Sequence, residues 1–271
     1  MKQSSEKIGF AIITCNRKFF FEKCINSIPE LDEVVVVNDG KAYESNIYPS
    51  KVTKIIQNDR NRGIAYSKNA ALKYMLEEKC KHLFLCEDDI ALKDSDVIYK
   101  YINASKVSGI YHFNYGFHGD WNRDSNGEPV PRFIKKYDNE TSLTFNRELT
   151  GALSYFRDEV IESVGLIDEF YKNVFEHVDH TFRIIKKGFH PPLYWFADIE
   201  NSYEYILELD PKLEKSLNTK SNFNYWIRIK FFTLYFILKN GRKPHKFYDA
   251  TEDEVVRILD KMKLERGKSA R

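Results

Sequence analysis

The stretch His82-Leu83-Phe84-Leu85-Cys86-Glu87-Asp88-Asp89 passes from a short apolar run directly into three consecutive acids. The apolar part predicts a buried strand over residues 82–86. Adjacent carboxylates at the end of such a strand are costly unless a positive partner compensates their charge. Mg²⁺ or Mn²⁺ would be such a partner, because carboxylate oxygens are the ligands that these cations prefer. The alternative is a solvated turn whose acids lie near a helix N-terminus.

Strands and helices alternate along the first hundred residues. Apolar or β-branched runs predict further strands over residues 8–14, 33–37 and 53–56, and helical spacing predicts helices over 19–28 and 64–78. This alternation predicts an α/β fold with a mostly parallel sheet, flanked by helices and joined by right-handed crossovers. Ligands bind such sheets at the carboxyl ends of the strands. Polar residues follow those ends: Asn16, Arg17, Asp39, Asp59 and Glu87 to Asp89.

The middle of the chain is less regular. Residues 108–145 are rich in Gly, Asn, Pro and aromatic residues, which is typical of functional or mobile loops. A strand followed by a helix is predicted over 151–164, a strong helix over 174–187 and a last strand over 193–197.

The two common phosphate-binding loops are absent from the sequence. It contains neither G-x-G-x-x-G nor G-x-x-x-x-G-K-[ST], so dinucleotide and P-loop sites have no support. Any bound phosphate must then be neutralised by a metal ion and by side chains.

Four motifs, in this order, resemble the family-2 inverting glycosyltransferases of the GT-A fold, of the type that makes bacterial polysaccharides and glycolipids. The motifs are Ile12-Ile13-Thr14-Cys15-Asn16-Arg17, Val36-Val37-Asn38-Asp39-Gly40, Asn61-Arg62-Gly63 with Asn69, and Leu85-Cys86-Glu87-Asp88-Asp89. The resemblance covers about residues 8–200 and implies a Rossmann-like sheet. It also implies transfer of a hexosyl or N-acetylhexosaminyl group from a nucleotide sugar, often a UDP-sugar. The acceptor would be a saccharide or a lipid-linked saccharide.

The resemblance assigns donor and metal roles to named positions. Those implied to hold the nucleotide sugar are Thr14, Asn16, Arg17, Asp39, Asn61, Gly63, Asn69, Asp88 and Gly151. Gly151 could equally mark a plain loop-to-strand turn. The family's Asp-x-Asp motif would place Asp89 and Glu87 on Mn²⁺ or Mg²⁺. Relatives often add a downstream His to this site, but residues 200–205 contain none.

The stretch Phe175-Glu176-His177-Val178-Asp179, followed by Arg183, resembles the helix start where that family binds and deprotonates the acceptor. An inverting transfer needs a base for the acceptor hydroxyl. His177 occupies the position of the family's usual base. The catalytic candidates are therefore His177, Asp179 and Glu176, and the sequence leaves the choice open. Glu176 could instead only favour the helix dipole.

The resemblance also divides the chain. We expect a catalytic domain over 1–210, with a nucleotide-binding half over about 1–107 and an acceptor half over about 108–210. Residues 211–271 would form a basic, aromatic helical extension. Its apolar core is too short to span a bilayer. It could pack on the catalytic domain, pair between subunits, or contact a membrane surface through residues 215–248.

Composition favours a cytoplasmic enzyme, working in solution or at the inner face of the cell membrane. The four cysteines lack metal-ligand spacing and indicate reduced thiols, and the N-terminus shows no secretory signal. Lys215 to Phe247 holds eight basic residues and no acid, although the net charge of the whole chain is only +2. The rest is therefore acidic, and we expect no nucleic-acid partner. The alternatives are a sugar nucleotidyltransferase, whose Gly-rich loop is missing, and a module that binds nucleic acid or another anion.

Overall fold

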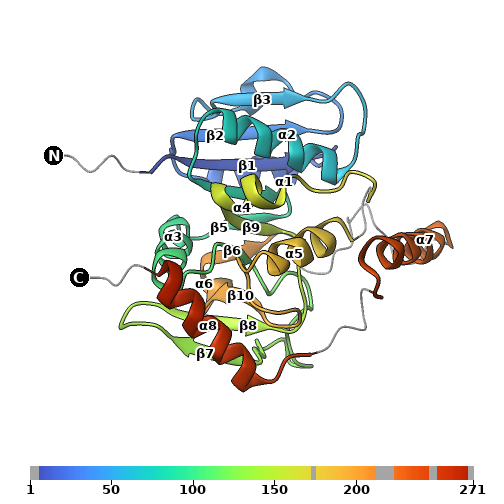
Figure 1. The fold of residues 1–271 in the computed structure, drawn as a ribbon. Coiled ribbons are helices and arrows are strands. Elements are labelled where there is room, and N and C mark those ends of the chain that lie inside the picture. Colours follow the sequence, from blue (N-terminus) through green and yellow to red (C-terminus); the bar gives the residue numbers. More distant parts are fainter. Residues whose placement is uncertain (1–5, 172–174, 211–222, 244–248, 268–271) are drawn as a thin grey trace.

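A six-stranded sheet forms the centre of the protein (Figure 1). The computed structural model describes residues 6–171, 175–210, 223–243 and 249–267. Neighbouring strands are parallel except β9, which runs antiparallel to both of its neighbours, so the expected mostly parallel sheet is confirmed. In spatial order the strands are β3 (Lys54–Gln57), β2 (Glu33–Asn38), β1 (Ile8–Thr14), β4 (His82–Glu87), β9 (Leu153–Arg157) and β6 (His112–Asn114).

Helices cover both faces of this sheet. Alternate side chains of β1 point to opposite faces, so that Phe10 and Ile12 pack with residues of α1 and α3, whereas Ala11 and Ile13 pack with residues of α2 and α4. Because β1 and β2 are buried on both faces, they form continuous apolar runs in the sequence. The helices are α1 (Lys18–Ser27), α2 (Ile64–Glu77), α3 (Asp96–Ser108), α4 (Asp158–Val164) and α5 (Glu176–Lys186).

Two smaller sheets lie beyond the central one. β10 (Phe196–Ile199), β8 (Ser142–Asn146) and β7 (Phe133–Lys136) form an antiparallel sheet in that order, and β5 (Ile90–Leu92) pairs with β11 (Ile206–Glu208). Directly after β11 the chain lies beside the three acids of residues 87–89, because the Leu209 N–H donates to the Asp89 carbonyl over 2.7 Å. The short helices η1 (Ser45–Ile47) and α6 (Ser202–Tyr205) lie in connections.

The C-terminal region contributes α7 (Phe223–Asn240) and α8 (Glu252–Arg266). α8 starts with a capping box formed by Thr251 and Glu254, and packs on α3. α7 buries Phe232 and Phe236. Across the described residues, no helix has both the length and the apolar character needed to cross a bilayer. Of the stretch predicted to contact membrane, residues 215–222 and 244–248 lie outside the described residues, and the division at residue 210 stays a prediction.

Some predicted boundaries differ from the structure. The strand predicted over 193–197 instead spans Phe196–Ile199, because a turn in which the Trp195 N–H donates to the Pro192 carbonyl delays its start. The irregular stretch 108–145 holds β6, β7 and most of β8. α5 begins at Glu176, because Phe175 has a left-handed backbone with φ of 66°.

Candidate active site

The carboxyl ends of β1, β2, β3 and β4 meet at one edge of the sheet. Thr14 pairs with Asn38, Asn38 with Gln57, and Ile13 with Glu87, so the residues after these strands are neighbours. A hollow of about 440 Å³ opens at this edge. Its walls include Asn16, Asp39, Gly40, Lys41, Gln57, Asn58, Asp59, Arg60 and Asn61. Three of the residues predicted to hold the donor thus line one cavity.

Asp39 organises the loop beside this hollow. Its Oδ1 accepts hydrogen bonds from the Arg62 N–H (2.7 Å) and the Asn58 amide (2.6 Å), and its Oδ2 accepts one from the Gly63 N–H (2.8 Å). The carboxylate therefore holds the start of α2, where free N–H groups favour negative charge. Asp39 and Gly63, both predicted to hold the donor, are bonded to each other here.

Position 40 requires a glycine, because the side chain of Asn16 lies very close to it. A Cβ at this position would lie only 2.5 Å from Oδ1 of Asn16. Asn16 itself has a left-handed backbone with φ of 57°, and its Oδ1 accepts from the Lys41 N–H over 2.8 Å. The loops after β1 and β2 are therefore fitted together at the mouth of the cavity.

Arg17 compensates two of the three acids. Its guanidinium pairs with Asp88 and, over 3.1 Å, with Oδ2 of Asp89. Thr14 donates its hydroxyl to Oδ2 of Asp88 over 2.6 Å. Burial raises the pKa of Asp88 to about 7, although Arg17 opposes that effect. The positive partner that the three acids demand is thus partly supplied by the protein itself.

The fit of a divalent cation rests on Asp89. Among the described residues, no three His, Cys, Asp or Glu side chains are grouped so as to hold a metal ion. However, Oδ1 of Asp89 is buried and has no hydrogen-bond partner. Mg²⁺ and similar hard cations often take one or two protein carboxylates and complete their shell with phosphate and water. One free carboxylate oxygen fits that manner of binding.

A second charged cluster joins the acidic motif to α5. The buried ammonium of Lys68 lies 2.8 Å from Oε1 of Glu87 and donates to the Gly151 carbonyl over 3.2 Å. A Cβ on Gly151 would lie 3.5 Å from Glu87, 3.6 Å from Lys68 and 3.7 Å from Cγ of His177. Residues from α2, β4, the loop before β9 and α5 therefore surround one small space.

Glu176 and His177 face this cluster as a pair. Nδ1 of His177 lies 3.1 Å from Oε1 of Glu176, while the other oxygen, Oε2, is buried and lacks a hydrogen-bond partner. Burial alone would raise the pKa of Glu176, but His177 and Lys68 bring it down to about 2. The carboxylate is charged at neutral pH. The left-handed Phe175 directly before it costs about 1–3 kcal/mol, which is common at functional sites.

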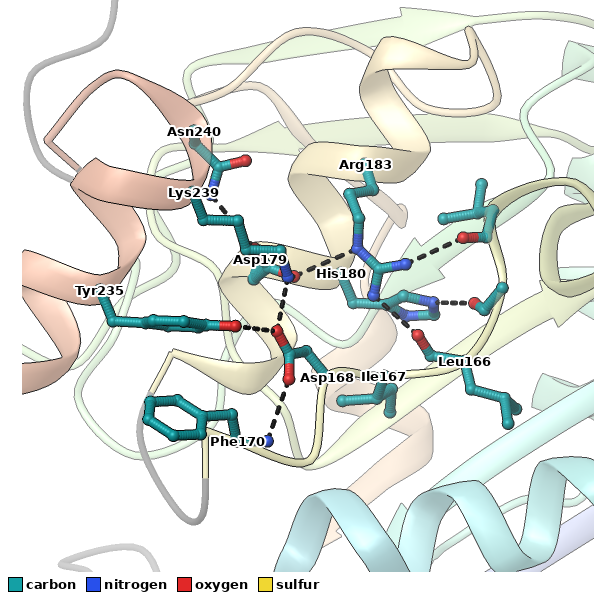
Figure 2. A network of polar contacts seen from close by, with 12 residues as sticks. Leu166, Ile167, Asp168, Phe170, Asp179, His180, Arg183, Tyr235, Lys239 and Asn240 are labelled. Atoms are coloured by element: carbon teal, nitrogen blue, oxygen red, sulfur yellow. Dashed lines mark hydrogen bonds and ion pairs between the residues drawn. The ribbon is translucent and has the colours of Figure 1, made fainter.

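Figure 2 shows Asp179 among the side chains of Arg183, Lys239 and Asn240. It is completely buried, and its oxygens are bonded to Arg183, Lys239 and Asn240. Of the three residues predicted as the base, Asp179 thus has its oxygens bound to other parts of the protein, whereas His177 remains partly exposed.

Asn69 also has a partner that the sequence does not reveal. Its amide donates to the Ile167 carbonyl (2.8 Å) and to Glu169 (2.9 Å), and its Oδ1 accepts from the Ile167 N–H. Its side chain therefore fixes the connection after α4, and these three bonds engage both ends of its amide.

Sequence reasoning missed Lys68 and the contact between His118 and Glu208. Lys68 carries a detectable signal, because it lies at helical spacing with the apolar residues Leu72 and Met75, on the buried face of α2. Nδ1 of His118 lies 3.5 Å from Glu208, and the nearby acids, Glu208 and Asp89 among them, raise the pKa of this buried imidazole. No local sequence pattern predicts this contact, because the two residues are 90 positions apart.

The sequence profile of the family described as "Glycosyl transferase family 2" matches residues 10–165, which is more than half of the chain. A search of curated proteins found no significant match.

Solved structures show the same fold. S. aureus TarS aligns with 96% of this chain and 43% of its own, with 16% identity and a TM-score of 0.53, so this chain spans less than half of that protein. Its 1–349 fragment in complex with UDP-GlcNAc aligns over 72% of its length, with 14% identity and a TM-score of 0.52. The mannosyltransferase PcManGT from Pyrobaculum calidifontis, in complex with GDP-Man and Mn²⁺, aligns over 68% of its length with 15% identity and a TM-score of 0.51. Identities this low establish similarity of fold alone.

Proposed function

The chain belongs to glycosyl transferase family 2 and is a glycosyltransferase with a GT-A fold, and from this premise we propose the reaction that it catalyses. It moves a hexosyl or N-acetylhexosaminyl group from a UDP-sugar to a hydroxyl of a saccharide or lipid-linked saccharide, with inversion. The observation that carries the proposal is a series of neighbouring contacts. Asn16 and Asp39 line the hollow, and Arg17, the next residue after Asn16, pairs with Asp88 and Asp89. Gly151 then lies between Glu87 and His177, which is bonded to Glu176. Synthesis of a surface polysaccharide or glycolipid is the corresponding role.

Asp89 would hold Mn²⁺ or Mg²⁺ through its free Oδ1. When bound, such a cation neutralises the diphosphate that leaves. Glu87 is a weaker candidate, because Lys68 already lies 2.8 Å from its Oε1. Arg17 adds a fixed positive charge at the same edge and would contact the phosphates.

His177 is the base that we favour. Its Nδ1 is bonded to Glu176, which leaves Nε2 to take the acceptor proton as the acceptor oxygen bonds to the anomeric carbon. The bond between that carbon and the diphosphate oxygen breaks, and the nucleoside diphosphate departs. Glu176 orients the imidazole and stabilises its protonated form. Gly151 leaves room for the sugar beside this pair.

Donor binding tests the proposal directly. We expect UDP-GlcNAc or another UDP-sugar, with Mn²⁺ and at about 100 times its Kd, to stabilise the fold by about 2.7 kcal/mol. That corresponds to a rise of about 5 °C in Tm for a chain of this size. GDP-mannose serves as the comparison donor. If no nucleotide sugar changes the Tm, with or without Mn²⁺, the result would contradict a donor site.

Product analysis separates the rival enzyme. A transferase releases a nucleoside diphosphate, whereas a sugar nucleotidyltransferase releases free diphosphate. We expect UDP as the released product and a glycosidic bond of inverted configuration in the sugar product by NMR. Salt-sensitive binding to nucleic acid without turnover of the donor would instead favour the binding module.

The outer face of α7 supports contact with a membrane. Trp226, Ile227, Phe231, Leu234 and Leu238 are all more than half exposed. The same helix carries Arg228 and Lys230, and no acid lies within its bounds. Apolar side chains beside basic ones suit the headgroup layer of an anionic bilayer. We therefore place the enzyme at the inner, cytoplasmic face of the cell membrane.

Vesicle binding tests that placement. We expect co-sedimentation with phosphatidylglycerol vesicles, weakened by high salt, and little with phosphatidylcholine. Replacing Leu234 and Leu238 by Ser should reduce binding without lowering Tm, because both side chains are exposed. Equal binding to both lipids or to neither would contradict the proposal. A dimer that dissociates in the double variant would assign this face to a second copy of the chain.

A further inference from the structure

The last turn of α7 is tied to the first turn of α5. The ammonium of Lys239 lies 2.6 Å from Oδ2 of Asp168 and 2.8 Å from Oδ2 of Asp179. Asn240 donates to Oδ1 of Asp179 over 3.2 Å, and Tyr235 donates to Asp168 over 3.0 Å. Figure 2 shows these side chains converging from α7 on two aspartates of the catalytic fold.

Within the part of the chain that the structure describes, Lys239 is one of two cations that pair with the buried Asp179. The other is Arg183, whose Nε lies 3.1 Å from Oδ2 of Asp179. The two remaining nitrogens of Arg183 are committed to the carbonyls of Val164 and Leu166. Arg183 therefore also holds the connection after α4. Together, Arg183 and Lys239 balance the two carboxylates of Asp179 and Asp168, so α7 supplies one of the two positive charges of this cluster.

Asp179 stands one helical turn after the strained start of α5. Its N–H donates to the Phe175 carbonyl over 2.9 Å. Phe175 has a left-handed backbone and directly precedes Glu176 and His177. A strained conformation persists only where its surroundings hold it. The contacts of Asp179 are part of what holds this one.

We propose that Lys239 is a positioning residue: by binding Asp179 and Asp168 it fixes the turn that presents His177 and Glu176 to the acceptor. This inference rests on the proposed base and names a residue outside the substrate site on which that base depends. Lys239 touches neither Glu176 nor His177 through any contact in the described residues. Its effect passes through Asp179 and the first turn of α5.

Lys239→Met tests the proposal, with Lys135→Met as the matched control. Lys135 ties the other C-terminal helix to the fold, because its ammonium lies 2.8 Å from Asp260 of α8. Hydrogen–deuterium exchange is the first measurement and needs no acceptor. In Lys239→Met we expect amides 179–181, the first hydrogen-bonded amides of α5, to exchange about tenfold faster or more, with β1 and β4 unchanged. In Lys135→Met the faster exchange should fall in α8 instead.

Turnover is the second measurement. We expect Lys239→Met to lower kcat by about tenfold to a hundredfold, because small displacements of catalytic groups have effects of that size. The KM for the donor should stay within about twofold, since the residues around the hollow at Asn16 and Asp39 are untouched. Lys239→Arg keeps the charge and should recover most of kcat, whereas Lys135→Met should leave kcat unchanged.

Unchanged exchange in the first turn of α5 would overturn the proposal. So would faster exchange there with normal kcat, or faster exchange throughout the sheet, which would make Lys239 a general stabiliser. If wild-type protein turns over no donor, the proposed function fails, while exchange still decides whether Lys239 holds the turn.

Discussion

The donor edge and the acceptor side of this site are built differently. At the donor edge, most acids already have partners. Asp39 accepts from the Arg62 and Gly63 N–H groups just before α2, Asp88 has Arg17, and Glu87 has Lys68. On the acceptor side, Glu176 keeps a buried oxygen without a hydrogen-bond partner, and it follows a residue with a strained backbone.

This difference indicates that the two halves of the site have different tasks. The donor edge is largely charge-compensated before any ligand arrives, with Oδ1 of Asp89 as the exception, and this suits the binding of a polyanion. The acceptor side holds a left-handed Phe175, which is more strained than the left-handed Asn16 of the donor edge because Asn tolerates that conformation, and it also holds an unsatisfied carboxylate. Natural proteins keep such features mainly where chemistry occurs. Changes at the two places should therefore differ in kind as well as in size.

Asp89→Ala should have the largest effect. In the described residues it removes the only buried carboxylate oxygen of residues 87–89 that has no hydrogen-bond partner. We expect kcat/KM to fall by about a thousandfold or more, since a metal site stabilises the leaving diphosphate by several kcal/mol. Initial rates with saturating Mn²⁺ measure this, and circular dichroism should show an intact fold. Asp94→Ala, at an exposed position, is the control. Undiminished turnover in Asp89→Ala would remove the metal assignment.

His177→Ala tests the acceptor side. We expect kcat to fall by about a hundredfold, in the range typical of a lost general base, with the KM for the donor little changed. Added imidazole should restore part of the rate, because it replaces the missing group. Glu176→Gln should lower kcat less, because it only weakens the contact that orients the imidazole of His177. A full rate in His177→Ala would return the role to Glu176 or Asp179.

Asp39→Asn tests whether the hydrogen bonds of Asp39 stabilise the donor edge in the absence of a ligand. The amide cannot accept on both sides as the carboxylate does, so we expect the free energy of unfolding to fall by about 2 kcal/mol. Urea denaturation measures the change. Asp59→Asn lines the same hollow but is exposed, so it should leave stability unaltered. Equal effects of the two substitutions would contradict the idea of a preformed edge.

Gly151→Ala should have the smallest effect and lies where the two halves meet. The added methyl would make ordinary contacts with Glu87, Lys68 and His177, so folding should be normal. It would take space beside the transferred sugar, and we expect the KM for the donor to rise by about tenfold, or 1.4 kcal/mol. If the KM for the donor is unchanged, Gly151 is a plain turn residue, as the sequence also allowed.

Much of the fold could be predicted because its signals are local. The apolar runs of β1, β2 and β4 and the spacing of α2 mark those elements without any knowledge of contacts. The strand predicted over 193–197 was misplaced, because the turn at Pro192 is decided by a backbone hydrogen bond rather than by apolar pattern.

The sequence by itself determined that Asn16, Asp39 and the acids Glu87 to Asp89 gather at one edge, since the carboxyl ends of parallel strands meet wherever the alternation of strand and helix is kept. Only the tertiary structure decided their partners. Arg17 lies between two acids, Lys68 reaches Glu87, and Asn69 binds a connection about 100 residues away. Lys239 likewise holds Asp179 from 60 residues further along the chain. Charge pairing depends on distance in space, and a one-dimensional pattern does not contain that distance.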